Sequence, residues 1–186
     1  PMHLRHDPAY CAAAIATYVR DLTQHLGADQ VGTVGRIDVY PNLVNVVPAR
    51  VVLTVDLRNT NELILEEAEA RLAAYLEELA EIEGVEISTT SLSRFEPVDF
   101  DPAMVDLVER TGRRLGYTTR RMSSGAGHDA QMLARVCPTA MVFTPSVNGL
   151  SHNIAEFTHA ADIEAGANVL LQVALDLLTT GRATES

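Results

Sequence analysis

Hydrophobic and polar positions follow two periods along the first half of the chain. Residues 9–26 and 63–83 carry apolar side chains at helical spacing, and each run ends at a glycine, which is typical of a helix C-terminus. Residues 31–40 and 50–58 alternate between apolar and polar side chains, and residues 85–92 alternate again. The pattern therefore predicts helices over the first two ranges and strands over the other three.

The order helix, strand, strand, helix, strand predicts an α+β sandwich, in which helices cover one face of an antiparallel sheet. We expect this domain to span residues 1–95. A segment with two prolines at residues 95–102 follows and reads as a linker. Residues 96–186 then form a second domain.

In the second half, the pattern predicts helices over residues 102–115 and 161–178, with a short helix at 129–135. Residues 118–122 and 139–144 read as short strands. Strands that alternate with helices predict an α/β arrangement. Each strand leads into a glycine-rich turn, and open α/β sheets bind ligands beyond the carboxyl ends of their strands.

The two glycine-rich turns each carry one histidine. The first reads SSGAGHDA and contains His128, and the second reads PSVNGLSHN and contains His152. Imidazole is the usual side chain for metal ligation or proton transfer near neutral pH. The two turns are therefore candidates for a functional site, and the alternative is that both histidines are ordinary surface residues.

One histidine cannot hold a catalytic metal, because such sites use three or more protein ligands. Asp129 neighbours His128, but we expect it to cap the short helix that it opens. Glu156 lies four residues beyond His152, and an ordinary salt bridge is favoured for it over support of a metal ligand. The chain thus holds part of a metal site, or the histidines bind something without a metal.

Two further polar residues sit in apolar strand-like runs. Arg58 shares a strand face with Asp56, so it forms either a surface ion pair or a fork for a substrate carboxylate. Asn45 lies among valines, so it is either a buried amide that needs a partner or a turn residue that bonds its own backbone. The pattern leaves both alternatives open.

Composition narrows the class of protein. The formal net charge is −11 over 186 residues, which argues against nucleic acid or an anionic membrane as a partner. Hydrophobic residues make up 47%, enough for a packed core. Cys11 and Cys137 lie in apolar surroundings and read as buried thiols of a reducing compartment. The start of the chain lacks an apolar signal segment, so we expect a cytoplasmic protein.

Several of these segments together resemble one known family. The motifs occur in order along the chain: PNLVNVVP at 41–48, VDLR at 55–58, SGAGHDAQ at 124–131, FTPS at 143–146 and NGLSHN at 148–153. They are similar to motifs of the binuclear-metal amidohydrolases that include N-carbamoyl-L-amino-acid amidohydrolase, allantoate amidohydrolase and β-ureidopropionase.

The resemblance implies a homodimeric enzyme of two domains. Residues 1–95 would be most of a lid and dimerisation domain, and residues 96–186 the C-terminal part of an α/β metallohydrolase domain. Such enzymes hold two divalent ions (zinc, manganese, cobalt or nickel), and His152 matches their last metal-ligating histidine. The reaction is hydrolysis of a carbamoyl or ureido C–N bond.

The same resemblance implies roles for five more residues. His128 would polarise the scissile carbonyl, with Gly127 beside the substrate. Asn45 and Arg58 would bind the substrate carboxylate. Gln131 would also contact the substrate, and its surroundings are slightly closer to allantoate amidohydrolases.

The chain also departs from the family, whose N-terminal half carries the other metal ligands and the general base. We therefore expect a C-terminal fragment that lacks the first lid strand, is inactive alone and need not bind metal by itself. An N-carbamoyl amino acid or ureido acid is the expected substrate of the intact enzyme. Allantoate hydrolysis is the alternative, and a non-catalytic dimerisation or binding module is the alternative of another class.

Overall fold

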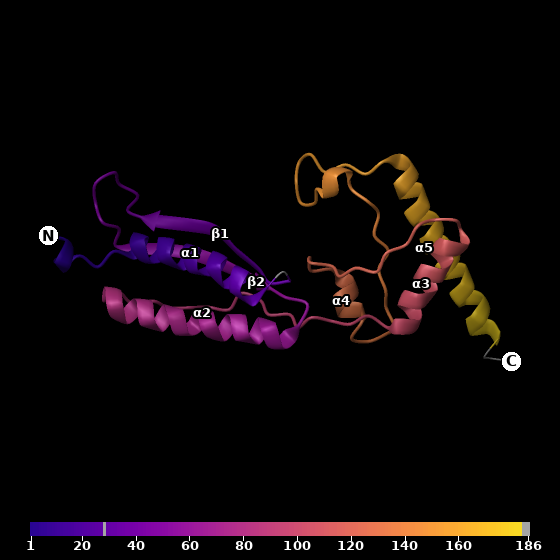
Figure 1. Cartoon of the computed structure of the whole chain (residues 1–186), viewed down its shortest axis with the longest axis horizontal. Helices are drawn as coiled ribbons and strands as arrows, with labels where there is room; N and C mark the ends of the chain where they lie inside the picture. Colours follow the sequence, from indigo (N-terminus) through magenta and orange to yellow (C-terminus); the bar gives the residue numbers. More distant parts are fainter. Residues whose placement is uncertain (28, 184–186) are drawn as a thin grey trace. The chain divides into compact units, whose positions relative to one another are not determined.

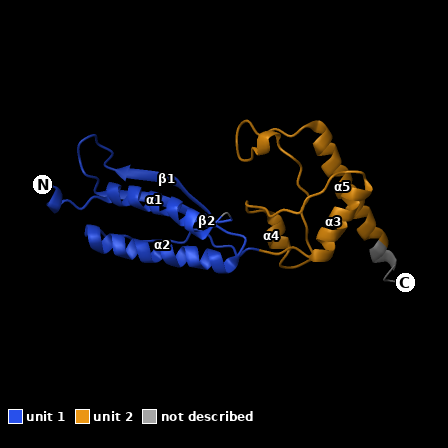
Figure 2. Cartoon of the chain, viewed as in Figure 1, with its two compact units in different colours: residues 1–97 blue, residues 98–186 orange. Residues whose placement is uncertain are grey.

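The computed structural model describes residues 1–27 and 29–183. The chain forms two compact units, residues 1–97 and residues 98–186 (Figure 2). Each unit has its own helices. Among the described residues, no helix is long and apolar enough to cross a membrane.

Within residues 1–27 and 29–97, the first unit has two long helices and one antiparallel pair of strands (Figure 1). Helix α1 spans Pro8–Leu26, strand β1 Val31–Tyr40, strand β2 Arg50–Arg58 and helix α2 Glu62–Glu83. A short 3₁₀ turn, Met2–Leu4, precedes α1. The predicted α+β arrangement of an antiparallel sheet and two helices is confirmed.

Both long helices begin and end at residues suited to those positions. The Asp7 carboxylate accepts a hydrogen bond from the Ala9 backbone N–H at 2.9 Å, and the Asn61 side chain accepts one from Leu63 at 3.0 Å. Caps of this kind stabilise a helix by about 1 kcal/mol each. Helix α2 ends where Gly84 adopts a left-handed φ of 63°.

A bulge at Gly35 interrupts the pairing of β1 with β2. Val34 pairs with Val55, but the next pair along the ladder joins Arg36 to Thr54, so Gly35 has no opposite residue. The extra residue shifts the side chains that follow it onto opposite faces. The strict alternation predicted for residues 31–40 therefore holds only on either side of the bulge.

The bulge keeps Val34, Ile37 and Val39 of β1 on one face of the sheet. Val34 packs against the helices before the bulge. After it, Ile37 and Val39 lie opposite Leu53 and Val51 and so share their face. The buried centre of this unit is formed by Cys11, Ile15, Val19 and Leu79, with half-buried Val34, Leu53, Val55, Leu57 and Leu76 packed against it.

The third predicted strand, residues 85–92, is not a strand in the structure. Val85 and Ile87 do pack against the buried centre of the unit, as period-two alternation requires. A strand, however, is defined by a hydrogen-bonded neighbour, and the described residues form only the β1–β2 ladder. The alternation thus predicted the buried side chains correctly and the backbone pairing wrongly.

In the part of the second unit that the structure describes, there are three α-helices and one 3₁₀ turn, Val147–Gly149. Helix α3 spans Pro102–Arg114, α4 Asp129–Leu133 and α5 Ala160–Ala183. Helix α4 is shorter than predicted, and α5 begins one residue earlier. Helices α3 and α5 lie side by side (Figure 1).

Neither strand predicted for the second unit, residues 118–122 or 139–144, forms a ladder within the described residues. Side chains of the first of these segments turn instead to α3, where Arg121 forms ion pairs with Asp106 and Glu109. The cysteine between the two segments, Cys137, is exposed rather than buried as predicted.

Two helix glycines let these extended segments approach closely. A side-chain carbon added at Gly112 of α3 would lie 2.8 Å from the Thr119 methyl group. One added at Gly166 of α5 would lie 2.5 Å from the methyl group of Thr144. Because real contacts of this kind are longer, glycine is required for this packing. Each segment is thus held against a helix just before the turn that carries a histidine.

Candidate functional site

The first histidine turn ends at helix α4. Ser124 closes the turn, because its hydroxyl donates a hydrogen bond to the Ala126 carbonyl at 3.0 Å. Gly125 and Gly127 are exposed, and His128 follows them at the entry to the helix. The turn therefore holds an exposed imidazole at a fixed point of the backbone.

His128 itself caps helix α4. Its Nδ1 accepts a hydrogen bond from the Ala130 backbone N–H at 3.0 Å, so the prediction that Asp129 is the cap was wrong. A nitrogen that accepts carries no proton, so the neutral ring carries its proton on Nε2. The cap thus leaves Nε2 as a hydrogen-bond donor. Gln131 follows one turn of helix later, and its backbone N–H donates to the His128 carbonyl at 2.9 Å.

The second turn has an unusual backbone. Asn148, Gly149 and His152 have positive φ angles of 58°, 67° and 55°. A hydrogen bond of 2.8 Å from the Val147 N–H to the Phe157 carbonyl closes the base of the loop. Left-handed backbone at a non-glycine residue is sparsely populated and gathers at functional sites. His152 is therefore presented from a conformation that its surroundings must support.

Glu156 contacts the backbone of His152 and not its ring. One carboxylate oxygen accepts a hydrogen bond from the His152 N–H at 3.0 Å. The predicted salt bridge of Glu156 was wrong, since none of the ion pairs among the described residues includes it. The sequence did not predict that Glu156 would bind the His152 backbone. The four-residue spacing indicated only that a contact across the turn was possible.

The described residues do not form a metal site by themselves. No group of three or more histidine, cysteine, aspartate or glutamate side chains is placed to hold an ion within residues 1–27 and 29–183. His152 can supply one ligand at most. A zinc-like ion needs three or four, so this chain alone does not fit the binuclear centre that the resemblance implies.

On the first unit, Arg58 is held by Asp56 of the same strand. Nε and Nη2 donate to the two carboxylate oxygens at 2.8 and 2.9 Å, which confirms that the two side chains share a face. The hydrogen bond from Arg58 lowers the pKa of Asp56. Both side chains are about half exposed. The pair therefore fixes the direction of a guanidinium group at the end of β2.

Asn45 lies in the loop between the two strands. The loop is closed at its base by a hydrogen bond of 2.8 Å from the Ala49 N–H to the Tyr40 carbonyl, and the Arg50 guanidinium stacks on the Tyr40 ring. Asn45 is exposed, as is Val44 next to it, so the interpretation of a buried amide was wrong. The loop offers an accessible amide flanked by apolar side chains.

The predicted site residues are divided between the two units. Asn45 and Arg58 belong to residues 1–97, whereas Gly127, His128, Gln131 and His152 belong to residues 98–186. The structure brings Gly127, His128 and Gln131 together at one end of α4. It places His152 in the other turn of the same unit.

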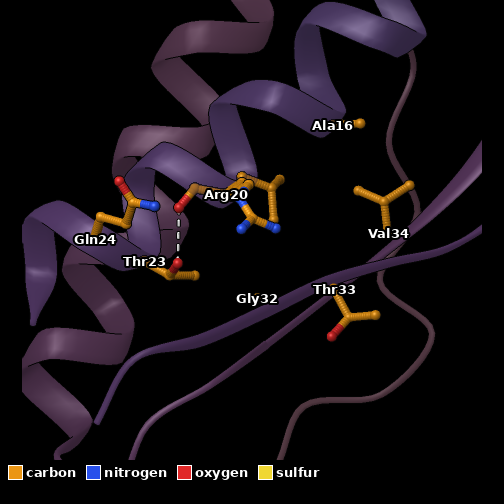
Figure 3. A pocket seen from close by; sticks show the side chains of 8 residues that line it. Ala16, Arg20, Thr23, Gln24, Gly32, Thr33 and Val34 are labelled. Atoms are coloured by element: carbon orange, nitrogen blue, oxygen red, sulfur yellow. Dashed lines mark hydrogen bonds between the residues drawn. The ribbon is translucent and has the colours of Figure 1, made fainter. Parts of the chain in front are cut away.

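A hollow of about 520 Å³ lies between α1 and β1 in the first unit (Figure 3). Figure 3 shows Val34 of the strand pointing toward Ala16 of the helix, whereas the Thr33 side chain points away from the helix. None of the predicted site residues lines it. The hollow reflects helix–strand packing beside Gly32, and no catalytic group lies in it.

This chain is similar to known proteins over a range that includes both histidine turns. The profile of Peptidase family M20/M25/M40 matches residues 7–176, which include both histidine turns and the β1–β2 hairpin. The chain is 38% identical to N-carbamoyl-L-amino-acid amidohydrolase of Rhizobium meliloti over 95% of its own length. It is 34% identical to allantoate amidohydrolase of Escherichia coli over 91%.

Solved structures of named amidases are also similar to this chain. An amidase of the hydantoinase/carbamoylase family from Burkholderia vietnamiensis superimposes with a TM-score of 0.91 and 39% identity over 95% of this chain. The chain covers 43% of that structure, 42% of the Rhizobium meliloti relative and 41% of the Escherichia coli relative. It therefore spans about two fifths of the length of the proteins that it matches.

Proposed function

Because the chain belongs to Peptidase family M20/M25/M40, we propose that it acts as part of an amidohydrolase that cleaves the C–N bond of a carbamoyl or ureido group. The observation that carries the proposal is similarity above 30% to named amidohydrolases across both histidine turns. An N-carbamoyl-L-amino acid is the proposed substrate, and allantoate is the alternative. Both carry a urea-type carbonyl and a carboxylate.

His128 is the proposed group that acts on the scissile carbonyl. Its Nδ1 is occupied by the Ala130 N–H, so the neutral ring offers Nε2–H as a donor. A fixed donor aimed at the carbonyl oxygen becomes more favourable as water attacks and negative charge develops there. The capping bond thus serves catalysis by fixing both the tautomer and the ring. Gly127 and Gln131 border the same end of α4 and are proposed to contact the substrate.

Arg58 and Asn45 are the proposed contacts of the substrate carboxylate. Arginine suits this role because its planar guanidinium has five donors in a fixed fork. Asp56 binds two of them and so holds the group in place. The Asn45 amide supplies a neutral donor from the exposed loop. Binding of the carboxylate would orient the carbonyl for attack.

The resemblance also supports a binuclear centre of zinc, manganese, cobalt or nickel, to which His152 would add one ligand. Such ions supply activated water and polarise carbonyls. This chain alone lacks a set of three such ligands among its described residues. A homodimeric state is a further proposal from the same resemblance, and a cytoplasmic location is proposed from the two free cysteines.

A chimeric protein tests the function. It joins this chain to the part of the Rhizobium meliloti relative that the chain does not cover, and release of the amino acid from an N-carbamoyl amino acid is measured. We expect turnover by the chimera and none by the 186-residue chain alone. A folded, metal-loaded chimera without turnover on either substrate class would favour the non-catalytic module.

Two variants of the chimera separate the roles of the site residues. His128→Asn keeps an oxygen that can cap α4 but removes the imidazole, and we expect kcat to fall by about 10²–10³-fold. Arg58→Ala should raise KM by about 10–100-fold with metal content unchanged, because it removes a charged hydrogen-bond donor. Equal loss of metal in Arg58→Ala would contradict the carboxylate role.

A further inference from the structure

The turn that carries His152 is held by hydrogen bonds rather than by packing. Every residue from 151 to 157 is exposed, and Ile154 and Phe157 are among the most exposed apolar side chains of the unit. Yet His152 keeps a left-handed φ of 55°. A residue with a β-carbon rarely adopts this conformation unless something stabilises it. The support must come from polar contacts within the turn.

Three hydrogen bonds link residues 152–156. Asn153 accepts the Ala155 N–H on its side-chain oxygen at 2.9 Å and the Glu156 N–H on its carbonyl at 3.0 Å. These two bonds fold the chain back toward His152. The Glu156 carboxylate then accepts the His152 N–H at 3.0 Å. This last bond is the one that acts directly on the backbone of His152.

From this geometry we infer that Glu156 is a positioning residue that holds the His152 backbone in its left-handed conformation and so sets the direction of the imidazole. The inference rests on the proposed function only in giving His152 a ligand to bind. A backbone N–H bonded to a carboxylate is a charge-assisted hydrogen bond, stronger than one to a neutral acceptor. Glu156 also leaves the ring itself without a carboxylate contact.

Nuclear magnetic resonance of the 186-residue chain tests the inference. We compare Glu156→Ala, Glu156→Gln and the control Glu164→Ala, which removes an exposed carboxylate from α5 of the same unit. The readouts are hydrogen exchange of the His152 amide, the coupling constant that reports its φ, and the ring resonances of His152.

We expect Glu156→Ala to speed exchange of the His152 amide by about 5–10-fold, as loss of one hydrogen bond predicts, and to change its coupling constant and ring resonances. Glu156→Gln should speed exchange of this amide less than Glu156→Ala does, because the glutamine side-chain oxygen still accepts the bond but carries no charge. Glu164→Ala should match the unaltered chain. An unchanged amide, coupling constant and ring in Glu156→Ala would overturn the inference, as would failure of Gln to restore them.

Metal content of the chimera separates this inference from the proposed function. If Glu156→Ala alters the His152 backbone and lowers metal content, the result supports both the positioning role of Glu156 and the assignment of His152 as a metal ligand. If it alters the backbone while metal content is unchanged, the positioning role stands and the assignment of His152 as a metal ligand fails.

Discussion

At the scale of single residues, the two cysteines have opposite environments. Cys11 is 4% exposed in the buried centre of the first unit. Burial raises the pKa of its thiol, with smaller contributions from Glu83 and Asp7. Cys137 is exposed beside the end of α4, where its thiol contacts the Leu133 carbonyl at 3.5 Å. Thiolate is the reactive form, so access and pKa both disfavour reaction at Cys11.

Thiol labelling checks this contrast. In the folded chain at pH 8, a disulfide reagent should modify Cys137 rapidly and Cys11 only as the protein unfolds. Cys137→Ser should abolish the rapid phase, whereas Cys11→Ala should leave it in place. Two thiols that react at equal rates in the folded chain would show that the core around Cys11 is open.

At the scale of elements, two glycines of β1 differ in what surrounds them. A side-chain carbon at Gly32 would meet the Thr23 methyl at 2.8 Å and a Val19 methyl at 3.0 Å, both on α1. At Gly35 the nearest atom is the Thr54 hydroxyl at 3.9 Å. The first glycine lets helix α1 lie close to the strand, and the second forms the bulge.

Alanine substitutions at these two glycines test whether the space around them differs. Gly32→Ala should destabilise the first unit by about 1–3 kcal/mol, because the added methyl overpacks the helix–strand contact. Gly35→Ala is the matched control, and we expect a change within about 0.5 kcal/mol, since its surroundings are open. Urea unfolding measures both. Equal stability of the two variants would contradict the close approach of α1 to β1.

At the scale of the whole molecule, an acidic chain uses arginines to hold its carboxylates. The net charge is −11. Arg121 bonds Asp106 at 2.5 Å and Glu109 at 2.6 Å, and Arg94 forms ion pairs from its exposed segment to α2. The bond from Arg121 lowers the pKa of Glu109 below its ordinary value of 4.5.

This pairing gives stability a definite pH dependence. A carboxyl group whose pKa is lowered by folding stabilises the fold above its unfolded pKa, and that contribution is lost as the pH falls through its folded pKa. We therefore expect melting temperature to fall below pH 4.5 less steeply in Arg121→Ala than in the unaltered chain. Because these groups are exposed, high salt should reduce the difference. Parallel acid profiles would contradict the role of Arg121.

Local signals along the sequence predicted much of this fold. Asp7, Asn61 and Gly84 define the ends of the helices because capping depends on a few neighbouring residues. Strand pairing depends on distant partners, which explains why residues 85–92 were predicted as a strand that the structure lacks. The bulge at Gly35 was equally hidden, since alternation alone does not reveal a one-residue insertion.

In the candidate site, too, the sequence predicted the residues better than the hydrogen bonds that they form. The sequence located both histidine turns and the Asp56–Arg58 pair, because residue type and spacing were sufficient. The sequence predicted Asp129 as the N-cap of α4, whereas the cap is His128, because aspartate is a common cap and histidine is not. The bond from Glu156 to a backbone N–H depends on the fold of the turn, which no residue type predicts.

The unpaired glycine of β1 has a consequence for how this hairpin tolerates changes in length. Removing residue 35 would close the bulge, so that Arg36 would follow Val34 directly and still pair with Thr54, and Ile37 and Val39 would keep the face that they share with Leu53 and Val51. Removing a residue from the 41–49 loop would leave the same pairing intact. Relatives that differ in length here should therefore gain or lose residues at the bulge or at the hairpin tip, where the amide proposed to bind the substrate is carried.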